Sequence, residues 1–240
     1  MVELFAHDYA GAHFVWLGPA HLGALACIVI ACFAVSRLRL TDGRANERVR
    51  LALAASLVVN ELAWHIWKAV VGEWTIQTML PLQLCSVMVW VSAFALVTRN
   101  PFLYELVYFL GIGGAIQALL TPDLGIYGFP HFRFLQTMTS HGLIIISAVA
   151  LTSLERMRPT WTSLARVVLW IHGYMAVIFA LNRAIGSNYL MLNGKPGTPS
   201  LLDLLPPWPA YIAFMEVIGL ATLLLLYLPF EIRHRKQGAR

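Results

Sequence analysis

Charged residues are scarce in this chain of 240 amino acids. Only 12% of the residues are Asp, Glu, Lys or Arg, about half the usual share in soluble domains, whereas 59% are hydrophobic. A chain with so little polar surface cannot cover a globule in water, so its apolar surface must lie in lipid. It also lacks a long polar stretch that would form a second domain. The composition therefore predicts one membrane domain over residues 1–240.

Cysteine is rarer still, and the three cysteines, Cys27, Cys32 and Cys85, lack the paired spacing of a disulfide framework or a zinc knuckle. They indicate no redox compartment and no structural metal. The net charge of +5 does not indicate nucleic-acid binding, because the basic residues form short blocks between apolar runs. We expect no cofactor, no metal and no nucleic-acid partner, and membrane lipids as the partners of the chain.

Seven apolar runs are long enough to cross a bilayer, whose hydrocarbon core of about 30 Å requires roughly 20 helical residues. We expect an all-α polytopic bundle of about seven transmembrane helices. The predicted spans cover residues 15–36, 49–71, 81–98, 102–120, 135–153, 162–184 and 208–229. Glu3 and Asp8 precede the first run without any Lys or Arg, so this run is not expected to be a removable signal peptide.

Basic residues are distributed unevenly between the two sides of the predicted bundle. One side holds only four, Lys68, Arg133, Arg183 and Lys195. The other holds thirteen, namely Arg37, Arg39, Arg44, Arg48, Arg50, Arg99, Arg156, Arg158, Arg166, Arg233, Arg235, Lys236 and Arg240. Lys and Arg favour the cytoplasmic side, so we expect the N-terminus outside and the C-terminus in the cytoplasm of a multi-pass cell-membrane protein.

Polar side chains within the spans are costly in hydrocarbon and therefore point to function. Glu61 and His65 are one turn apart and share a face of the second span. When each span is followed in its predicted direction, candidates from different spans fall near one level in the outer half of the bilayer, with Glu61 a turn deeper. They are Glu61, His65, Gln83, Cys85, Gln117, His141, Asn182 and Glu216. This convergence predicts an outer polar pocket.

Each of these residues also has a plain structural interpretation. Gln117, Thr137 and Ser140 have the side chains that commonly join membrane helices by hydrogen bonds, and we favour that role for them. Cys27 and Cys32 are expected to be small packing residues. His141 on its spacing alone fits a hydrogen-bonded core histidine as well as a functional one.

Four short motifs resemble the YwaF-type family of integral membrane proteins. They are Leu80-Pro81-Leu82-Gln83-Leu84-Cys85, Ser140-His141-Gly142, Asn188-Tyr189 and Trp208-Pro209-Ala210-Tyr211. The resemblance extends over about residues 15–228 and implies that the whole bundle has the fold of that family. The family often has His at the position of Gln83. This chain departs from the family there, so a mechanism that needs a base at this position does not follow from the resemblance.

Eukaryotic relatives in that family are described as cysteine-dependent acyltransferases that act on ether phospholipids. The resemblance therefore implies a lipid acyltransferase or acyl hydrolase with Cys85 as nucleophile and His141 as its base. The chemistry is sound, because a thiolate is the reactive form and a nearby imidazole can take the thiol proton. Asn182 or Gln83 would donate a hydrogen bond to the oxyanion. His131 and Arg133 would contact the phosphate of a phospholipid head group.

Other functions stay open on the sequence. In a membrane metal hydrolase, Glu61, His65 and His141 would be ligands, but the last span contains no histidine of the kind such hydrolases carry there. In a transporter or channel, the polar layer would be a substrate or proton site, although its residues occupy one leaflet rather than a path across both. A non-catalytic assembly factor is a further alternative.

Overall fold

The computed structural model describes residues 3–38, 42–195, 197 and 201–238, and the regular elements within them are helical. Six long helices are α1 (Pro19–Arg37), α2 (Gly43–Val70), α3 (Leu84–Thr98), α6 (Phe132–Ser153), α7 (Trp161–Ile185) and α8 (Ala210–Gly238). Between α3 and α6, the segments α4 (Pro101–Leu106), η2 (Val107–Gly111) and α5 (Ile112–Leu120) form one continuous rod, in which η2 is π-helical. Short 3-10 turns are η1 (Glu3–Phe5), η3 (Tyr189–Met191) and η4 (Leu201–Leu204). The all-α bundle is confirmed.

Six of the helices in the described ranges are long and apolar enough to cross a membrane: α1, α2, the α4–α5 rod, α6, α7 and α8. The remaining predicted span, which is the third along the chain at residues 81–98, is shorter than expected. It forms α3, which has 15 residues and begins at Leu84. At 1.5 Å per residue α3 is about 22 Å long, less than the thickness of the hydrocarbon core. Its length is sufficient because it lies inside the bundle, where Met88, Val89 and Leu96 are buried.

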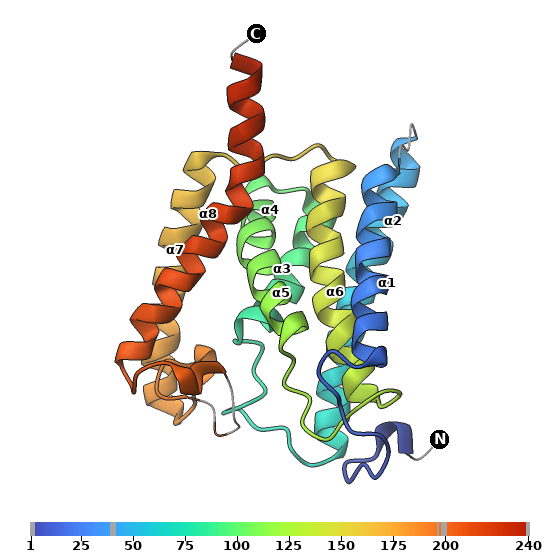
Figure 1. Cartoon of the computed structure of the whole chain (residues 1–240), viewed down its shortest axis with the longest axis vertical. Helices are drawn as coiled ribbons and strands as arrows, with labels where there is room; N and C mark the ends of the chain where they lie inside the picture. The colour runs from blue at the N-terminus through green and yellow to red at the C-terminus, as the bar shows by residue number, and fades with distance from the viewer. Residues whose placement is uncertain (1–2, 39–41, 196, 198–200, 239–240) are drawn as a thin grey trace.

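The helices run roughly along one direction (Figure 1). α1, α2 and α6 lie on one side, α3 and the α4–α5 rod in the middle, and α7 and α8 on the other side (Figure 1). The N-terminal segment and the first turns of α1, α3, α6 and α8 lie at one end, called here the N-terminal end of the bundle. Large apolar side chains on the outer helices, such as Val29, Leu169 and Val217, are exposed, as expected for surfaces that face lipid.

Glycines let α6 approach its neighbours closely. A Cβ at Gly142 would lie 2.8 Å from Cγ1 of Ile28 on α1. A Cβ at Gly111 would lie 3.0 Å from Cγ2 of Ile144 on α6. Small residues at such crossings are typical of membrane helix packing. The glycine of the Ser140-His141-Gly142 motif therefore positions α1 against the helix that carries His141.

Buried ion pairs join the helices at the opposite end. The Nε of Arg50 lies 2.9 Å from Oε1 of Glu155, and Nη1 of Arg50 donates to the carbonyl oxygen of Leu96. Glu105 accepts from the Ser163 hydroxyl at 2.8 Å and pairs with Arg166. These basic residues belong to the predicted cytoplasmic set, of which Arg39 and Arg240 lie outside the described residues. The orientation itself stays a prediction.

Candidate functional site

A cavity of about 240 Å³ lies toward the N-terminal end of the bundle, between α2, α3, α6 and the loop of residues 71–83. Most of the side chains around it are polar. They are Glu61, His65, Thr78, Gln83, Cys85, Ser86, Arg133, Gln136, Ser140 and His141, with Trp64, Met79 and Leu80 as the apolar part. Six of the predicted site residues thus surround one space, because the C-terminal half of α2 and the loop meet the first turn of α3 and the N-terminal half of α6.

The loop at this cavity is held by tyrosines from distant parts of the chain. The Tyr189 hydroxyl donates to the carbonyl oxygen of Ile76 and accepts from the amide of Leu80, both at 2.8 Å. The Tyr174 hydroxyl donates to the carbonyl oxygen of Leu82 at 2.8 Å. Tyr189 is fully buried, so these bonds fix the chain just before α3. They set where α3 begins and hence where Cys85 lies.

Asn182 holds Tyr189 rather than facing the cavity. Its Nδ2 donates to the carbonyl oxygen of Tyr189 at 2.8 Å, and its Oδ1 accepts from the amide of Tyr189 at 2.9 Å and from the Ser187 hydroxyl at 2.7 Å. Asn182 is buried with its oxygen fully occupied. Asn182 therefore supports the loop indirectly, through its bonds to Tyr189.

Gln83 caps the start of α3 and has one side-chain group left for a ligand. Its Oε1 accepts from the amide of Leu190 at 3.0 Å. This bond orients the amide group, so that Nε2 is the end available on the cavity side. The amides of the first turn of α3, which include that of Cys85, lack partners inside the helix. These donors therefore lie at the start of α3, the helix whose first turn carries Cys85.

Cys85 and His141 face the cavity from different helices. Cys85 is in the first turn of α3, and a Cβ at Gly114 on the rod would lie 3.7 Å from its Sγ. Within the described residues Sγ has no hydrogen-bond partner, so thiol and imidazole share the cavity without a direct bond. Catalytic hydrogen bonds often tighten only when substrate is bound.

The two histidines at the cavity have opposite neutral tautomers. Nδ1 of His141 lies 2.8 Å from the carbonyl oxygen of Thr137, which only accepts, so Nδ1 carries the proton and Nε2 offers a lone pair. Nδ1 of His65 accepts from the indole nitrogen of Trp74 at 3.0 Å, so its proton is on Nε2. In the neutral state His141 is therefore ready to accept a proton, and His65 to donate a hydrogen bond.

Arg133 places a positive charge on the wall of the cavity. Its guanidinium lies over the Trp64 ring, 4.1 Å from the centroid. Nη1 donates to Oε1 of Gln136 at 3.2 Å, and Nη2 donates to the carbonyl oxygen of Asp123 at 3.4 Å. These contacts use two of its five donors and fix the plane of the guanidinium. The remaining donors suit an anionic group such as a phosphate.

His131 does not line the cavity. Nδ1 accepts from the amide of Arg133, and Nε2 donates to the carbonyl oxygen of Ala6, both at 3.0 Å. The side chain is buried, and loss of hydration lowers the pKa of His131. Both ring nitrogens are used by the backbone, and the contact of His131 with a head group stays a prediction. His131 fixes the N-terminal segment over the end of the bundle.

Two other predicted site residues lie away from the cavity. Gln117 is exposed on α5. Glu216 on α8 accepts from Nε2 of His172 on α7 at 2.8 Å, and so joins these two outer helices. The sequence predicts the same depth in the bilayer for Gln117 and Glu216 as for the cavity residues, but both lie on helix faces that point away from the cavity.

A family model described as the TMEM164 family matches residues 11–227. The chain belongs to the TMEM164 family. The match covers the helices and the cavity of this TMEM164-family chain, and it agrees with a multi-pass membrane protein. The match supports a family of transmembrane proteins, and it does not confirm the YwaF name that the motifs suggested. No curated protein and no solved structure matches the chain.

The sequence did not point to Trp64, Ser86 or Thr78, which also line the cavity of this TMEM164-family chain. Trp64 follows Glu61 by three residues, so helical periodicity places it on the same face. Ser86 directly follows Cys85. Thr78 has no comparable signal, because only the folded loop brings it here. Within the described part of the chain, no three His, Cys, Asp or Glu side chains are grouped to hold a metal ion.

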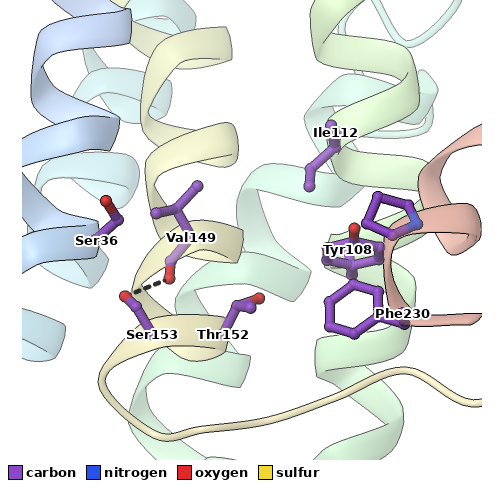
Figure 2. Close-up of a pocket in the computed structure, with 8 residues that line it drawn as sticks. Ser36, Tyr108, Ile112, Val149, Thr152, Ser153 and Phe230 are labelled. Carbon is purple, nitrogen blue, oxygen red and sulfur yellow. Dashed lines mark hydrogen bonds between the residues drawn. The ribbon is translucent and has the colours of Figure 1, made fainter. Parts of the chain in front are cut away.

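A second cavity, of about 290 Å³, lies toward the opposite end of the bundle (Figure 2). Figure 2 shows Val149 and Ser153 of α6 on one side of it and Tyr108 and Phe230 on the other. The hydroxyl of Ser153 donates to the carbonyl oxygen of Val149, and that of Tyr108 donates to Leu226. Because the hydroxyls of Ser153 and Tyr108 bond to backbone carbonyls, we do not assign them a reactive role in this second cavity of the TMEM164-family chain.

Proposed function

We propose that this membrane protein of the TMEM164 family is a thiol-dependent acyltransferase or acyl hydrolase of phospholipids. The observation that carries the proposal is the shared cavity of Cys85 and His141, with the proton of His141 held on Nδ1 by Thr137. This tautomer leaves Nε2 free as a base. A nucleophile and a base that face one space are the minimal parts of covalent acyl transfer.

In the first half of the reaction, the proton of the Cys85 thiol passes to Nε2 of His141, and the sulfur attacks the ester carbonyl of a lipid. A C–S bond forms, and the ester C–O bond breaks. The imidazolium of His141 returns the proton to the departing alkoxide, so that a lysolipid leaves. The acyl group then remains on Cys85 as a thioester.

The negative charge that develops on the carbonyl oxygen needs donors in a fixed geometry. Two sources adjoin Cys85. One is Nε2 of Gln83, whose Oε1 is occupied by Leu190. The other is the free first-turn amides of α3, where the helix dipole also favours negative charge. Gln83 thereby has a role that requires no base at its position.

The other end of the lipid is assigned to Arg133. Its guanidinium lies over the Trp64 ring and retains free donors at the same cavity. A phosphate there would make charge-assisted hydrogen bonds and hold the ester near Cys85. With the orientation predicted from the basic residues, the lipid would come from the outer leaflet of the cell membrane.

The proposal is tested by labelling purified protein with a lipid-tailed, thiol-reactive acyl probe. We expect Cys85→Ser to abolish labelling and His141→Ala to slow it by about 100-fold, in the range of general-base contributions. Cys27→Ser and Cys32→Ser are the matched controls and should label like wild type, because both thiols lie on α1, away from the cavity. If Cys85→Ser and His141→Ala also label like wild type, the catalytic pair is wrong.

A further inference from the structure

Glu61 is the acidic group at the cavity that the first half of the reaction does not use. Its side chain is buried, with 2% of the residue exposed, and it lines the same cavity as Cys85. Oε1 of this carboxylate has no hydrogen-bond partner within the described residues. Nε2 of His65 is 3.6 Å from Oε1, too far for a hydrogen bond, and the other polar neighbour of the carboxylate is the Ser86 hydroxyl.

A buried carboxylate oxygen without a partner is energetically unfavourable. Two helix-joining carboxylates of this chain show the contrast. Glu155 contacts Arg50 at 2.9 Å, and Glu105 accepts from Ser163 and pairs with Arg166 through Oε1. Oε2 of Glu105 also has no hydrogen-bond partner in the described residues, but that carboxylate is paired with an arginine, as Glu155 is, and Glu61 is not. Glu61 differs because its free oxygen faces a polar space large enough for a ligand. This is the arrangement expected where a bound molecule supplies the missing donor.

The surroundings limit which donor fits. The proton of neutral His65 is on Nε2 and points toward Glu61, because Trp74 occupies Nδ1. The N–H of His65 is therefore directed at the carboxylate of Glu61 from 3.6 Å. Glu61 and Cys85 line the same cavity. A hydroxyl that donates to Oε1 of Glu61 would thus be held beside the sulfur that carries the acyl group.

We propose that Glu61 binds the hydroxyl of the acyl acceptor and takes its proton in the second half of the reaction, which makes an alcohol such as a lysolipid the acceptor. This inference rests on the proposed function. The hydroxyl oxygen attacks the thioester carbonyl of acyl-Cys85. A C–O bond forms, the C–S bond breaks, and the hydroxyl proton moves to Glu61. The proton then returns to the sulfur, so the enzyme ends as it began.

The changes of charge on Glu61 and on the Cys85 sulfur favour this step. While Glu61 is a carboxylate, its negative charge opposes a second negative charge on the nearby sulfur. When it takes the proton of the acceptor, that opposition disappears just as the sulfur leaves as a thiolate. His141 acts in the first half of the reaction and Glu61 in the second.

The experiment separates the two halves with Glu61→Gln, which keeps the shape of the side chain but removes the base. Acylation of Cys85 is followed by the mass of the intact protein after mixing with a diacyl phospholipid. Transfer is followed by the diacyl product formed when a lysophospholipid is added. We expect Glu61→Gln to acylate within about threefold of wild type, to transfer about 100-fold more slowly, and to accumulate acyl-Cys85.

Two further measurements separate a missing base from a damaged site. Hydroxylamine attacks thioesters without a base from the protein, so it should release the acyl group from Glu61→Gln as fast as from wild type. Glu216→Gln is the matched control, since Glu216 pairs with His172 away from the cavity, and it should transfer like wild type.

Transfer at the wild-type rate by Glu61→Gln would overturn the inference, and so would an equal loss of acylation and transfer. A wild type that never carries an acyl group on Cys85 would instead overturn the proposed function, and the role of Glu61 with it.

Discussion

The hydroxyl of Tyr189 bridges Ile76 and Leu80, donating to the carbonyl oxygen of one and accepting from the amide of the other at 2.8 Å. Tyr189 follows Cys85 by more than 100 positions in the chain, yet it fixes the loop from which α3 starts. The Asn188-Tyr189 motif therefore supports the cavity from behind. Its contribution is structural, through the position of Cys85.

Tyr189→Phe removes this hydroxyl and leaves a backbone amide and a carbonyl without their partner. We expect a loss of about 1–3 kcal/mol in the free energy of unfolding, the usual range for unsatisfied buried groups. The measurement is denaturant-induced unfolding in detergent micelles. Tyr227→Phe is the control, because the hydroxyl of Tyr227 makes a long bond of 3.3 Å to Glu231 on its own helix and does not contact the loop before α3. Equal stability of both variants would show that the loop does not depend on Tyr189.

The spans could be predicted from the sequence because hydropathy and length report directly on what lies in lipid. The start of α3 could not. Residues 81–83 are apolar or neutral and fit a helix, but bonds from Tyr174, Tyr189 and Leu190 hold them as a loop. These partners come from about 90 to 110 residues away, and local propensity carries no information about them.

The depth of the polar residues along the spans could also be predicted from the sequence, but the direction in which their side chains point could not. Counting residues along a span gives depth, at 1.5 Å each. It does not give the rotation of a helix or the order of its neighbours. Cys85 and His141 therefore lie at one cavity, whereas Glu216 at a similar level contacts His172 instead. Asn182 faces Tyr189, whose position depends on a loop that periodicity cannot place.

Gly142→Ala should destabilise the bundle through the contact of α1 with α6. The new Cβ would lie 2.8 Å from Cγ1 of Ile28, so one of the helices must shift. We expect a cost of about 1–3 kcal/mol in the free energy of unfolding, as for other overpacked sites. Ile28→Ala in the same chain should restore part of it by removing the clash.

The control for Gly142 is Gly173→Ala on α7, where nothing lies within 4 Å of an added Cβ. This change should be neutral or stabilise slightly, because alanine is the better helix former. Thermal unfolding in micelles compares the two variants. Similar effects at both positions would argue that Gly142 matters for helix propensity and not for the approach of α1.

The N-terminal segment should be held most firmly at mildly acidic pH. Nε2 of His7 lies 2.8 Å from Oε1 of Glu73, which also pairs with Lys68. Hydrogen bonds with Glu73 and then Asp8 raise the pKa of His7 above 6.5, and bonds with Lys68 and then His7 lower the pKa of Glu73 below 4.5. The His7 contribution is complete below pH 6.5 and lost as pH rises through its raised pKa. The Glu73 contribution is complete above pH 4.5 and lost as pH falls through its lowered pKa.

The attachment is thus strongest between about pH 4.5 and 6.5. Hydrogen exchange of residues 3–8, compared at each pH with His7→Asn, measures it without the intrinsic effect of pH on exchange. We expect wild type to be more protected than His7→Asn at pH 5.5 and equal to it at pH 9. A difference that stays constant with pH would rule out the ion pair as its source.

Arg133→Gln should weaken substrate binding more than it slows chemistry, because the guanidinium reaches the far end of the cavity from Cys85 in the proposed reaction. With the acyl probe carrying a phosphate head group, we expect the probe concentration for half-maximal labelling of Cys85 to rise about tenfold, with the maximal rate changed less than threefold. A charge-assisted hydrogen bond of about 1.5 kcal/mol gives a change of this size. A probe of equal chain length without phosphate should label both proteins alike. If Arg133→Gln changes the labelling by both probes equally, Arg133 supports the cavity wall formed with Trp64 and Gln136 and does not bind the head group.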